Sequence, residues 1–229
     1  MNMKKTKIIV LGVIFFLGLL LVLIGFKSGS IDAPKTYESA IPLAEQNLLD
    51  KYLKNSENYF EYGSGGSTFQ SLKHKNLKRV YSIENDFAWI EKLRTYKFIS
   101  ASEKSHRLVF TYINIGPTKK WGYPTNLKYK DKFPSYIERF NDKNIKNGTD
   151  LILVDGRFRV ACILNAVLNA QPNTIIMVHD YSYRPYYHVV GKYLKFVDKE
   201  GSLYVFKVKK QVDKTEVKNL YNQYKFNPQ

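Results

Sequence analysis

The segment Tyr59-Phe60-Glu61-Tyr62-Gly63-Ser64-Gly65-Gly66-Ser67-Thr68 determines how the rest of this chain is interpreted. An aromatic, strand-like run that contains an acid ends in a glycine-rich turn, and two hydroxyl residues that can open a helix follow. Glycine lets the backbone approach a ligand closely and adopt positive φ, and a helix N-terminus offers N–H groups without intrahelical partners. The segment therefore predicts a nucleotide-type binding loop between a strand and a helix.

A second strand-then-acid pattern, Val80-Tyr81-Ser82-Ile83-Glu84, follows about sixteen residues further on. An acid at the end of the second strand of a βαβ unit is placed to bind ribose hydroxyls. The glycines fit neither the dinucleotide pattern G-x-G-x-x-G nor the P-loop, which needs Gly-Lys-Ser/Thr. A glycine-rich turn alone is usually only a turn, but the pairing with a second acid at this spacing favours a ligand site.

Residues 8–26 contain only aliphatic side chains, phenylalanine and glycine. Nineteen helical residues span about 28 Å at about 1.5 Å per residue, close to the hydrocarbon thickness of a bilayer. The alternative is a cleaved signal peptide, but its apolar core is normally shorter and Lys27-Ser28-Gly29-Ser30 is a poor cleavage site. We therefore predict an uncleaved single-pass anchor. Lys4, Lys5 and Lys7 slightly favour a cytoplasmic N-terminus.

The chain carries a formal net charge of +16. Without the four lysines that flank the predicted anchor, 32 basic residues still face 20 acidic ones. Such an excess favours anionic partners, but the basic residues are scattered and no nucleic-acid module is present, so no specific nucleic-acid partner is expected. Cys162 is the single cysteine, which excludes an intrachain disulfide within this sequence.

Strand and helix patterns alternate after an amphipathic stretch at 37–53. The predicted strands are 59–62, 79–83, 108–114, 150–154, 174–179 and 203–208, and the predicted helices are 68–73, 87–96, 135–140, 160–168 and 186–194. Runs such as Leu151–Val154 are apolar without alternation, as expected where helices cover both faces of a parallel sheet. We predict a doubly wound α/β sheet of about seven strands, with a long loop at 116–134.

This pattern divides the chain into four parts. They are an anchor (1–27), a linker with an amphipathic helix (28–56), an α/β domain (57–210) and a C-terminal tail (211–229).

Polar residues follow most of the predicted strands, and ligands of open α/β sheets bind beyond the carboxyl ends of the strands. These residues are Glu61, Glu84, Asn114, Asp155, His179 and Asp180. Asp155 and Asp180 could hold a divalent cation, or could cap the helices that follow. His179 is the candidate general base because its ordinary pKa lies near neutrality.

Five segments resemble a class I S-adenosylmethionine-dependent methyltransferase-like group. They are Tyr62–Thr68, Ser82–Trp89, Ile115–Thr118 with Trp121-Gly122, Val154–Ala161 and His179–Tyr181. The resemblance covers about residues 57–209 and implies S-adenosylmethionine as cofactor, with Glu84 on the ribose and Glu61 near the methionine end. The cofactor-binding residues that we predict are Glu61, Gly63, Ser64, Gly65, Gly66, Ser67, Glu84 and Asn85.

The end of the fourth and fifth strands is similar to that of metal-assisted O-methyltransferases, although Tyr181 stands where a further acid or Asn would follow Asp180. The sequence thus favours a membrane-anchored O-methyltransferase acting on a glycan, lipid-linked or small-molecule acceptor. Its predicted catalytic residues are His179, Asp155 and Asp180, the two acids also being the candidate metal ligands. Its predicted acceptor-binding residues are Trp121, Arg157, Arg159 and Arg184, the arginines holding an anionic group. The alternatives are a nucleic-acid methyltransferase and a non-catalytic binding or scaffold protein with this fold.

Overall fold

The computed structural model describes residues 39–229. The predicted anchor at residues 8–26, and with it the choice between anchor and signal peptide, lies outside this range. Within residues 39–229, no helix is both long and apolar enough to cross a bilayer.

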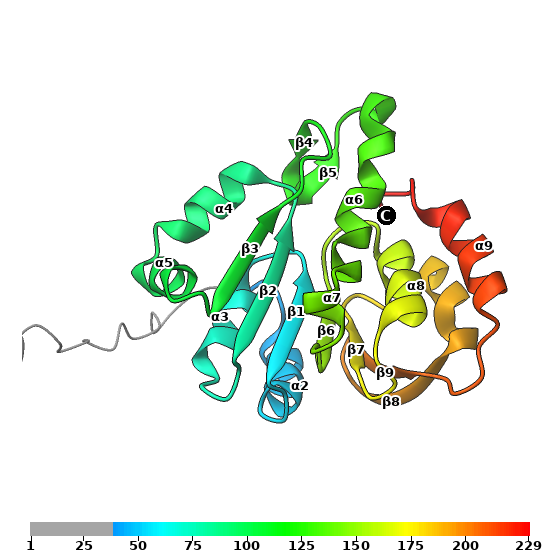
Figure 1. Cartoon of the computed structure of the whole chain (residues 1–229), viewed down its shortest axis with the longest axis horizontal. Helices are drawn as coiled ribbons and strands as arrows, with labels where there is room; N and C mark the ends of the chain where they lie inside the picture. The colour runs from blue at the N-terminus through cyan, green and yellow to red at the C-terminus, as the bar shows by residue number, and fades with distance from the viewer. Residues whose placement is uncertain (1–38) are drawn as a thin grey trace, which may run out of the picture. The chain divides into compact units, whose positions relative to one another are not determined.

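A seven-stranded sheet forms the centre of the described part, with the order β3-β2-β1-β6-β7-β9-β8 (Figure 1). The strands are β1 (Asn58–Tyr62), β2 (Arg79–Glu84), β3 (Leu108–Tyr112), β6 (Leu151–Val154), β7 (Ile175–Val178), β8 (Leu194–Glu200) and β9 (Leu203–Val208). The first five pair in parallel, and β9 runs antiparallel to both β7 and β8. The predicted Rossmann-like sheet is therefore confirmed. Its strand order reverses direction between β1 and β6, which is where such sheets bind ligands.

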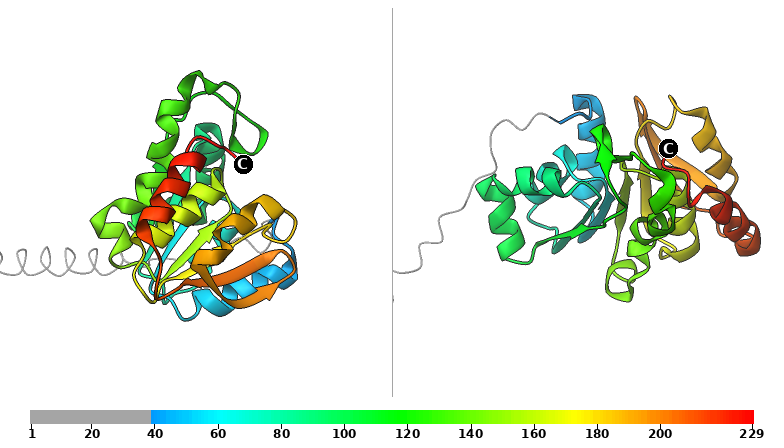
Figure 2. Two further views of the ribbon diagram at one scale, coloured as in Figure 1. Left: turned by 90° about the vertical axis from the view of Figure 1, so that its right-hand side faces the viewer. Right: turned by 90° about the horizontal axis from the view of Figure 1, so that it is seen from above.

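Two layers of helices cover the sheet (Figure 2). One apolar cluster includes residues of α2 (Leu43–Leu53), α3 (Gly66–Lys73), α4 (Phe87–Arg94) and α5 (Lys97–Lys104). The other includes residues of α6 (Phe133–Ile137), α7 (Lys143–Lys146), α8 (Arg159–Asn169) and α9 (Lys214–Tyr224). The predicted amphipathic helix and C-terminal tail thus supply α2 and α9, which belong to the same compact unit as the sheet.

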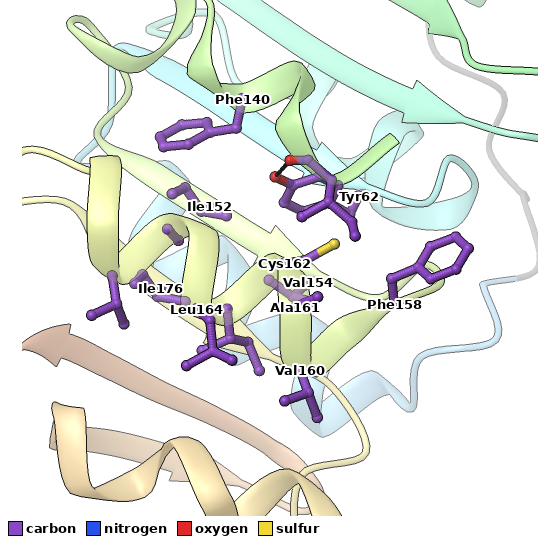
Figure 3. Close-up of a cluster of buried hydrophobic side chains, with 14 of the residues drawn as sticks. Tyr62, Phe140, Ile152, Val154, Phe158, Val160, Ala161, Cys162, Leu164 and Ile176 are labelled. Atoms are coloured by element: carbon purple, nitrogen blue, oxygen red, sulfur yellow. Dashed lines mark hydrogen bonds between the residues drawn. The ribbon is translucent and has the colours of Figure 1, made fainter. Parts of the chain in front are cut away.

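The second cluster is the larger, and α8 lies at its centre (Figure 3). Ala161 and Leu164 of this helix pack with Ile152 and Val154 of β6 and with Ile176 of β7. All four residues of β6 are buried, which agrees with the continuous apolar run that predicted a strand covered on both faces.

Several segments differ from the sequence-based expectation, and among them the short helices α5 and α7 were not predicted. Strand β8 was not predicted, because it is an exposed edge strand whose alternation of apolar and polar residues is weak. The predicted helix at 186–194 is a 3-10 helix, Pro185–Tyr193. The predicted loop at 116–134 contains a hairpin of β4 (Thr118–Lys119) and β5 (Tyr123–Pro124), a 3-10 helix at Leu127–Lys132 and the start of α6.

Candidate functional site

The carboxyl ends of β2, β1, β6 and β7 meet at one edge of the sheet, where backbone hydrogen bonds join successive strand ends. The N–H of Gly63 donates to the carbonyl of Ile83 (2.9 Å), and the N–H of Asp155 donates to Tyr62 (3.0 Å). The N–H of His179 donates to Val154 (3.2 Å). The strand register thus brings the glycine-rich segment and the three predicted catalytic residues to a common edge.

Two glycines of the predicted binding loop serve different needs. Gly63 has φ of +92°, and a Cβ there would lie 2.8 Å from the Cα of Gly156. Gly63 therefore permits the close approach of the β1 and β6 ends. A Cβ added at Gly65, by contrast, would have no atom within 4 Å. The open space beside Gly65 is what a ligand that contacts the loop backbone requires.

Polar contacts hold the backbone of this loop in place. Trp89 Nε1 donates to the carbonyl of Ser64 (2.9 Å), and the Ser64 hydroxyl lies 2.6 Å from that of Ser82. The N–H of Gly65 donates to Thr68 Oγ1 (2.9 Å) at the start of α3. Gly66 lies against Ser39, because a Cβ at position 66 would meet the Ser39 side chain. These contacts fix the conformation of the loop backbone.

Glu61 is fully buried beneath the loop rather than lining it. Its carboxylate accepts hydrogen bonds from the hydroxyls of Tyr59 (2.9 Å), Ser67 (2.6 Å) and Ser82 (2.6 Å), and also from Thr68. Burial raises the pKa of Glu61 and the hydroxyl donors oppose this rise. Glu61 and Ser67, both predicted to bind cofactor, thus join the loop and α3 to the ends of β1 and β2.

Glu84 ends β2 and faces the glycine loop. One carboxylate oxygen accepts the N–H groups of Asn85 (2.7 Å) and Asp86 (3.0 Å), and the other accepts the N–H of Ser64 (3.0 Å). Its side chain is only 7% exposed. Burial raises the pKa of Glu84 to about 7, although the three N–H donors act in the opposite direction. A carboxylate this poorly solvated gains strongly from further hydroxyl donors.

The raised pKa of Glu84 predicts that stability falls as pH rises. An unfolded Glu has a pKa of about 4.5, so the folded state binds more protons than the unfolded state between about pH 4.5 and 7. The contribution of Glu84 to stability is then fully present below pH 4.5, the pKa of the unfolded state, and is lost as the pH rises through about 7, the pKa of the folded state. The free energy of unfolding should decrease by up to about 3 kcal/mol over this range, at about 1.36 kcal/mol per pH unit.

Urea unfolding of wild type and Glu84→Gln at pH 5 and pH 8 measures this loss. Subtracting the free energy of unfolding of Glu84→Gln from that of wild type at each pH removes the contribution of all other titrating groups. Glu91→Gln, on the exposed face of α4, is the matched control. Parallel pH dependence of wild type and Glu84→Gln would contradict the assignment.

Asp155, His179 and Asp180 form one connected group around Arg159. Asp155 Oδ1 lies 2.9 Å from His179 Nδ1 and 3.1 Å from Arg159 Nη2, and Asp180 Oδ2 lies 3.3 Å from Arg159 Nη1. Although burial raises the pKa of Asp155, Arg159 and His179 lower it overall. Burial lowers the pKa of His179, but Asp155 and Asp180 raise it overall. The helix-cap alternative does not describe Asp155, because Phe158 precedes the first turn of α8.

A second carboxylate faces the other nitrogen of the His179 ring. Glu45 Oε2, from α2, lies 2.9 Å from Nε2, at ion-pair distance but without the alignment of a hydrogen bond. His179 therefore lies between two acids, and its side chain is only 12% exposed. The two contacts fix the orientation of the ring, with Nδ1 toward Asp155 and Nε2 toward Glu45.

The predicted cation between Asp155 and Asp180 does not fit this arrangement. Both acids already form ion pairs with the guanidinium of Arg159, which neutralises their negative charge. The Arg159 side chain is only 4% exposed. Within residues 39–229, no group of three or more His, Cys, Asp or Glu side chains is arranged to hold a metal ion.

The β4–β5 hairpin connects the two halves of the edge (Figure 1). Asn85 Nδ2 donates to the carbonyl of Gly122 (2.8 Å), and the guanidinium of Arg157 lies 4.0 Å from the ring centroid of Tyr123. Trp121, predicted to bind the acceptor, is 66% exposed at the turn of this hairpin. Arg184 pairs with Asp180 at 3.1 Å.

Sequence reasoning missed Glu45, Trp89 and Tyr123 as members of the site. Glu45 comes from a helix outside the predicted domain, and no local pattern indicates that it reaches His179. The sequence did contain an indication for the other two. Trp89 is an aromatic residue shortly after Glu84, and Tyr123 lies in the glycine- and proline-containing segment 116–124, so both flank the predicted site.

No family model matches the chain, and no curated protein matches it significantly. Among solved structures, a methyltransferase-like protein from Silicibacter pomeroyi is 28% identical, with a TM-score of 0.74, over 83% of this chain and 98% of its own. A candidate O-methyltransferase from Klebsiella pneumoniae is 13% identical, with a TM-score of 0.50, over 84% of this chain and 95% of its own. Residues 39–229 therefore have the fold of the class I methyltransferases.

Proposed function

We propose that this protein is an S-adenosylmethionine-dependent methyltransferase that methylates a hydroxyl oxygen. Two features of one loop support this proposal most directly. The backbone beside Gly65 has open space for a ligand. The neighbouring Ser64 N–H donates to the buried carboxylate of Glu84, so that this acid lies next to the space. The 28% identity to a methyltransferase-like protein supports the same reading.

The residues at the edge fit this cofactor. The Gly63–Thr68 backbone approaches the methionine part, Glu84 accepts the ribose hydroxyls, and Asn85 holds the hairpin over the β2 end. Bound S-adenosylmethionine supplies a sulfonium methyl group for in-line transfer to a nucleophile held close to it. Asp155 and His179 lie at the neighbouring strand ends, where the acceptor hydroxyl would lose its proton.

Calorimetry with S-adenosylhomocysteine, using the full chain in detergent, tests the cofactor assignment. Binding of this ligand, with no binding of NAD or ATP, is expected. Transfer of a labelled methyl group to a pool of hydroxyl-bearing glycans, lipid-linked sugars and small metabolites then tests the reaction. Absence of S-adenosylhomocysteine binding would reject the function.

His179→Ala is expected to lower turnover by about 10² to 10⁴, because positioned proton acceptors contribute that much. To act in this way, His179 must be deprotonated and must exchange its Nε2 contact with Glu45 for the acceptor hydroxyl. Cofactor affinity should stay nearly unchanged, since His179 contacts Asp155 and Glu45 rather than the glycine loop. The pKa of His179 is raised, so wild-type turnover should increase with pH through a value above 6.5. Steady-state rates between pH 5.5 and 9 provide the measurement, and equal turnover in both proteins would remove the general-base role.

The membrane anchor at residues 8–26 is part of the proposal, supported by its uninterrupted apolar sequence. A cytoplasmic N-terminus would place the catalytic part outside the cytosol or in a lumen. Carbonate extraction of cells that express the full chain should leave the protein in the membrane pellet. A soluble product that starts near residue 28 would instead establish a cleaved signal peptide.

A further inference from the structure

The three arginines near the ends of β6 and β7 differ in what they contact. Arg159 pairs with Asp155 and Asp180, and Arg184 also pairs with Asp180. Arg157 is 5% exposed and has no ion pair with any described carboxylate. Its Nε and Nη1 atoms have no hydrogen-bond partner among the described residues, and its guanidinium lies on the face of the Tyr123 ring.

A buried charged group without an ion pair costs free energy, and buried arginines in proteins are normally paired with an acid. The nearby carboxylate of Asp155 feels the charge of Arg157 but does not form an ion pair with it. The aromatic face of Tyr123 returns part of that cost but leaves the Nε and Nη1 donors of Arg157 unfilled. A planar fork with unfilled donors is the group that carboxylates and phosphates bind bidentately. Arg157 thus has the properties of a residue held in place for an anion.

The groups around Arg157 are also donors. We call Tyr123, Arg157, Arg184 and Tyr186 the arginine–tyrosine cluster. The Tyr123 and Tyr186 hydroxyls lie 3.3 Å and 3.5 Å from the same side-chain oxygen of Gln229, and Arg184 Nη1 lies 3.3 Å from the Tyr186 hydroxyl. An oxygen acceptor is therefore already accommodated between the two hydroxyls. Gln229 is itself exposed, so an incoming ligand can displace its side chain.

The position of the cluster relates it to the cofactor loop. Arg157 directly follows Gly156, whose backbone is so near Gly63 that a side chain at either position would collide with the other. Tyr123 belongs to the hairpin that also contacts Asn85 at the β2 end through Gly122. Arg157 thus belongs to the segment that follows β6 beside the glycine loop, and its ring partner Tyr123 belongs to the hairpin held at the β2 end.

We infer that the arginine–tyrosine cluster binds a carboxylate or phosphate group of the methyl acceptor, with Arg157 as its main donor. This inference rests on the proposed function and narrows its acceptor to an anionic hydroxyl compound, such as a hydroxy acid or a sugar phosphate. Arg159 belongs to the Asp155–His179–Asp180 group and does not bind the anion. The sequence-based assignment had treated the three arginines alike.

Thermal unfolding of the full chain in detergent, with inorganic phosphate or acetate as probes, tests the anion site. Sodium chloride at matched ionic strength corrects for screening. Phosphate, acetate or both should raise the unfolding midpoint of wild type above that in chloride, because an anion that binds only the folded state stabilises it. Arg157→Met should weaken the response about tenfold or more, whereas Arg79→Met, which removes an exposed arginine from β2, should retain it.

The midpoint without added anion separates a ligand-binding role from a structural one. Because Arg157→Met removes a buried charge that makes no ion pair with a described carboxylate, its midpoint should be at least as high as that of wild type. A substantial fall, or equal anion responses in Arg157→Met and Arg79→Met, would overturn the inference. No response of wild type beyond chloride would do the same. If Arg157→Met does not fold, Arg157→Lys keeps the charge without the planar fork and should show a weakened response.

S-adenosylhomocysteine binding distinguishes failure of this inference from failure of the proposed function. Wild type and Arg157→Met should bind it alike, since Arg157 lies outside the glycine loop. Binding of S-adenosylhomocysteine without an anion response rejects the anion site alone. An anion response without S-adenosylhomocysteine binding rejects the proposed function, and with it the acceptor assignment.

Discussion

Gly65→Val is expected to weaken S-adenosylhomocysteine binding by about 5- to 100-fold while leaving the unfolding midpoint almost unchanged. A Cβ at position 65 meets nothing within 4 Å, and φ of Gly65 is 164°, an extended value that any residue adopts. The valine would instead fill the space that the ligand requires. Overfilling a packed contact costs about 1–3 kcal/mol, and about 1.4 kcal/mol corresponds to a tenfold change in affinity.

Gly63→Val is the matched variant two residues earlier in the same loop. It should lower stability, because φ is +92° and a Cβ would lie 2.8 Å from the Cα and 2.9 Å from the backbone nitrogen of Gly156. Calorimetry and thermal unfolding of both variants separate the two roles. Unchanged S-adenosylhomocysteine affinity in Gly65→Val would show that the ligand does not use this loop.

Glu61→Ala is expected to lower the free energy of unfolding by at least about 3 kcal/mol, because it leaves several buried hydroxyls without their acceptor. The hydroxyls belong to Tyr59, Ser67, Thr68 and Ser82. Since two of them start α3 directly after the glycines, cofactor binding should weaken as well. Urea denaturation gives the loss of stability.

Ser67→Ala provides the control for Glu61→Ala. It removes one of the four donors and should cost about 1 kcal/mol, the usual contribution of a single hydrogen bond. A loss of stability in Glu61→Ala no larger than that in Ser67→Ala would contradict the view that Glu61 organises the loop. Retained cofactor binding in a strongly destabilised Glu61→Ala protein would show that the loop forms without its buried acid.

Local patterns predicted the central strands correctly where the signal was strong. The apolar runs 151–154 and 175–178 became β6 and β7, because a strand buried on both faces must be apolar throughout. The helix after the glycines was predicted from 68 and begins at Gly66, within the usual uncertainty of helix ends. Strand β8 had no such signal, since its charged residues face solvent at the sheet edge.

The structure assigned different roles to residues that the sequence treated as one set. Glu61 lies in the last two residues of β1 and Glu84 ends β2. Hydroxyl groups surround the Glu61 carboxylate, whereas backbone N–H groups surround that of Glu84. Arg157 and Arg159 are two residues apart and both buried, yet Arg159 alone meets two carboxylates. Spacing along the chain does not report which side chains meet, because the partners come from other strands.

The sequence by itself determined the βαβ order, the glycine-rich turn and the position of the polar strand ends. These features follow from periodicity and from backbone requirements that only local residues meet. Tertiary structure alone decided that Glu45 of α2 faces His179, that Arg159 holds Asp155 and Asp180, and that Arg157 lacks an acid. The physical reason is that charge pairing depends on distances of a few ångströms between residues up to 134 positions apart, and strand pairing and helix packing set those distances.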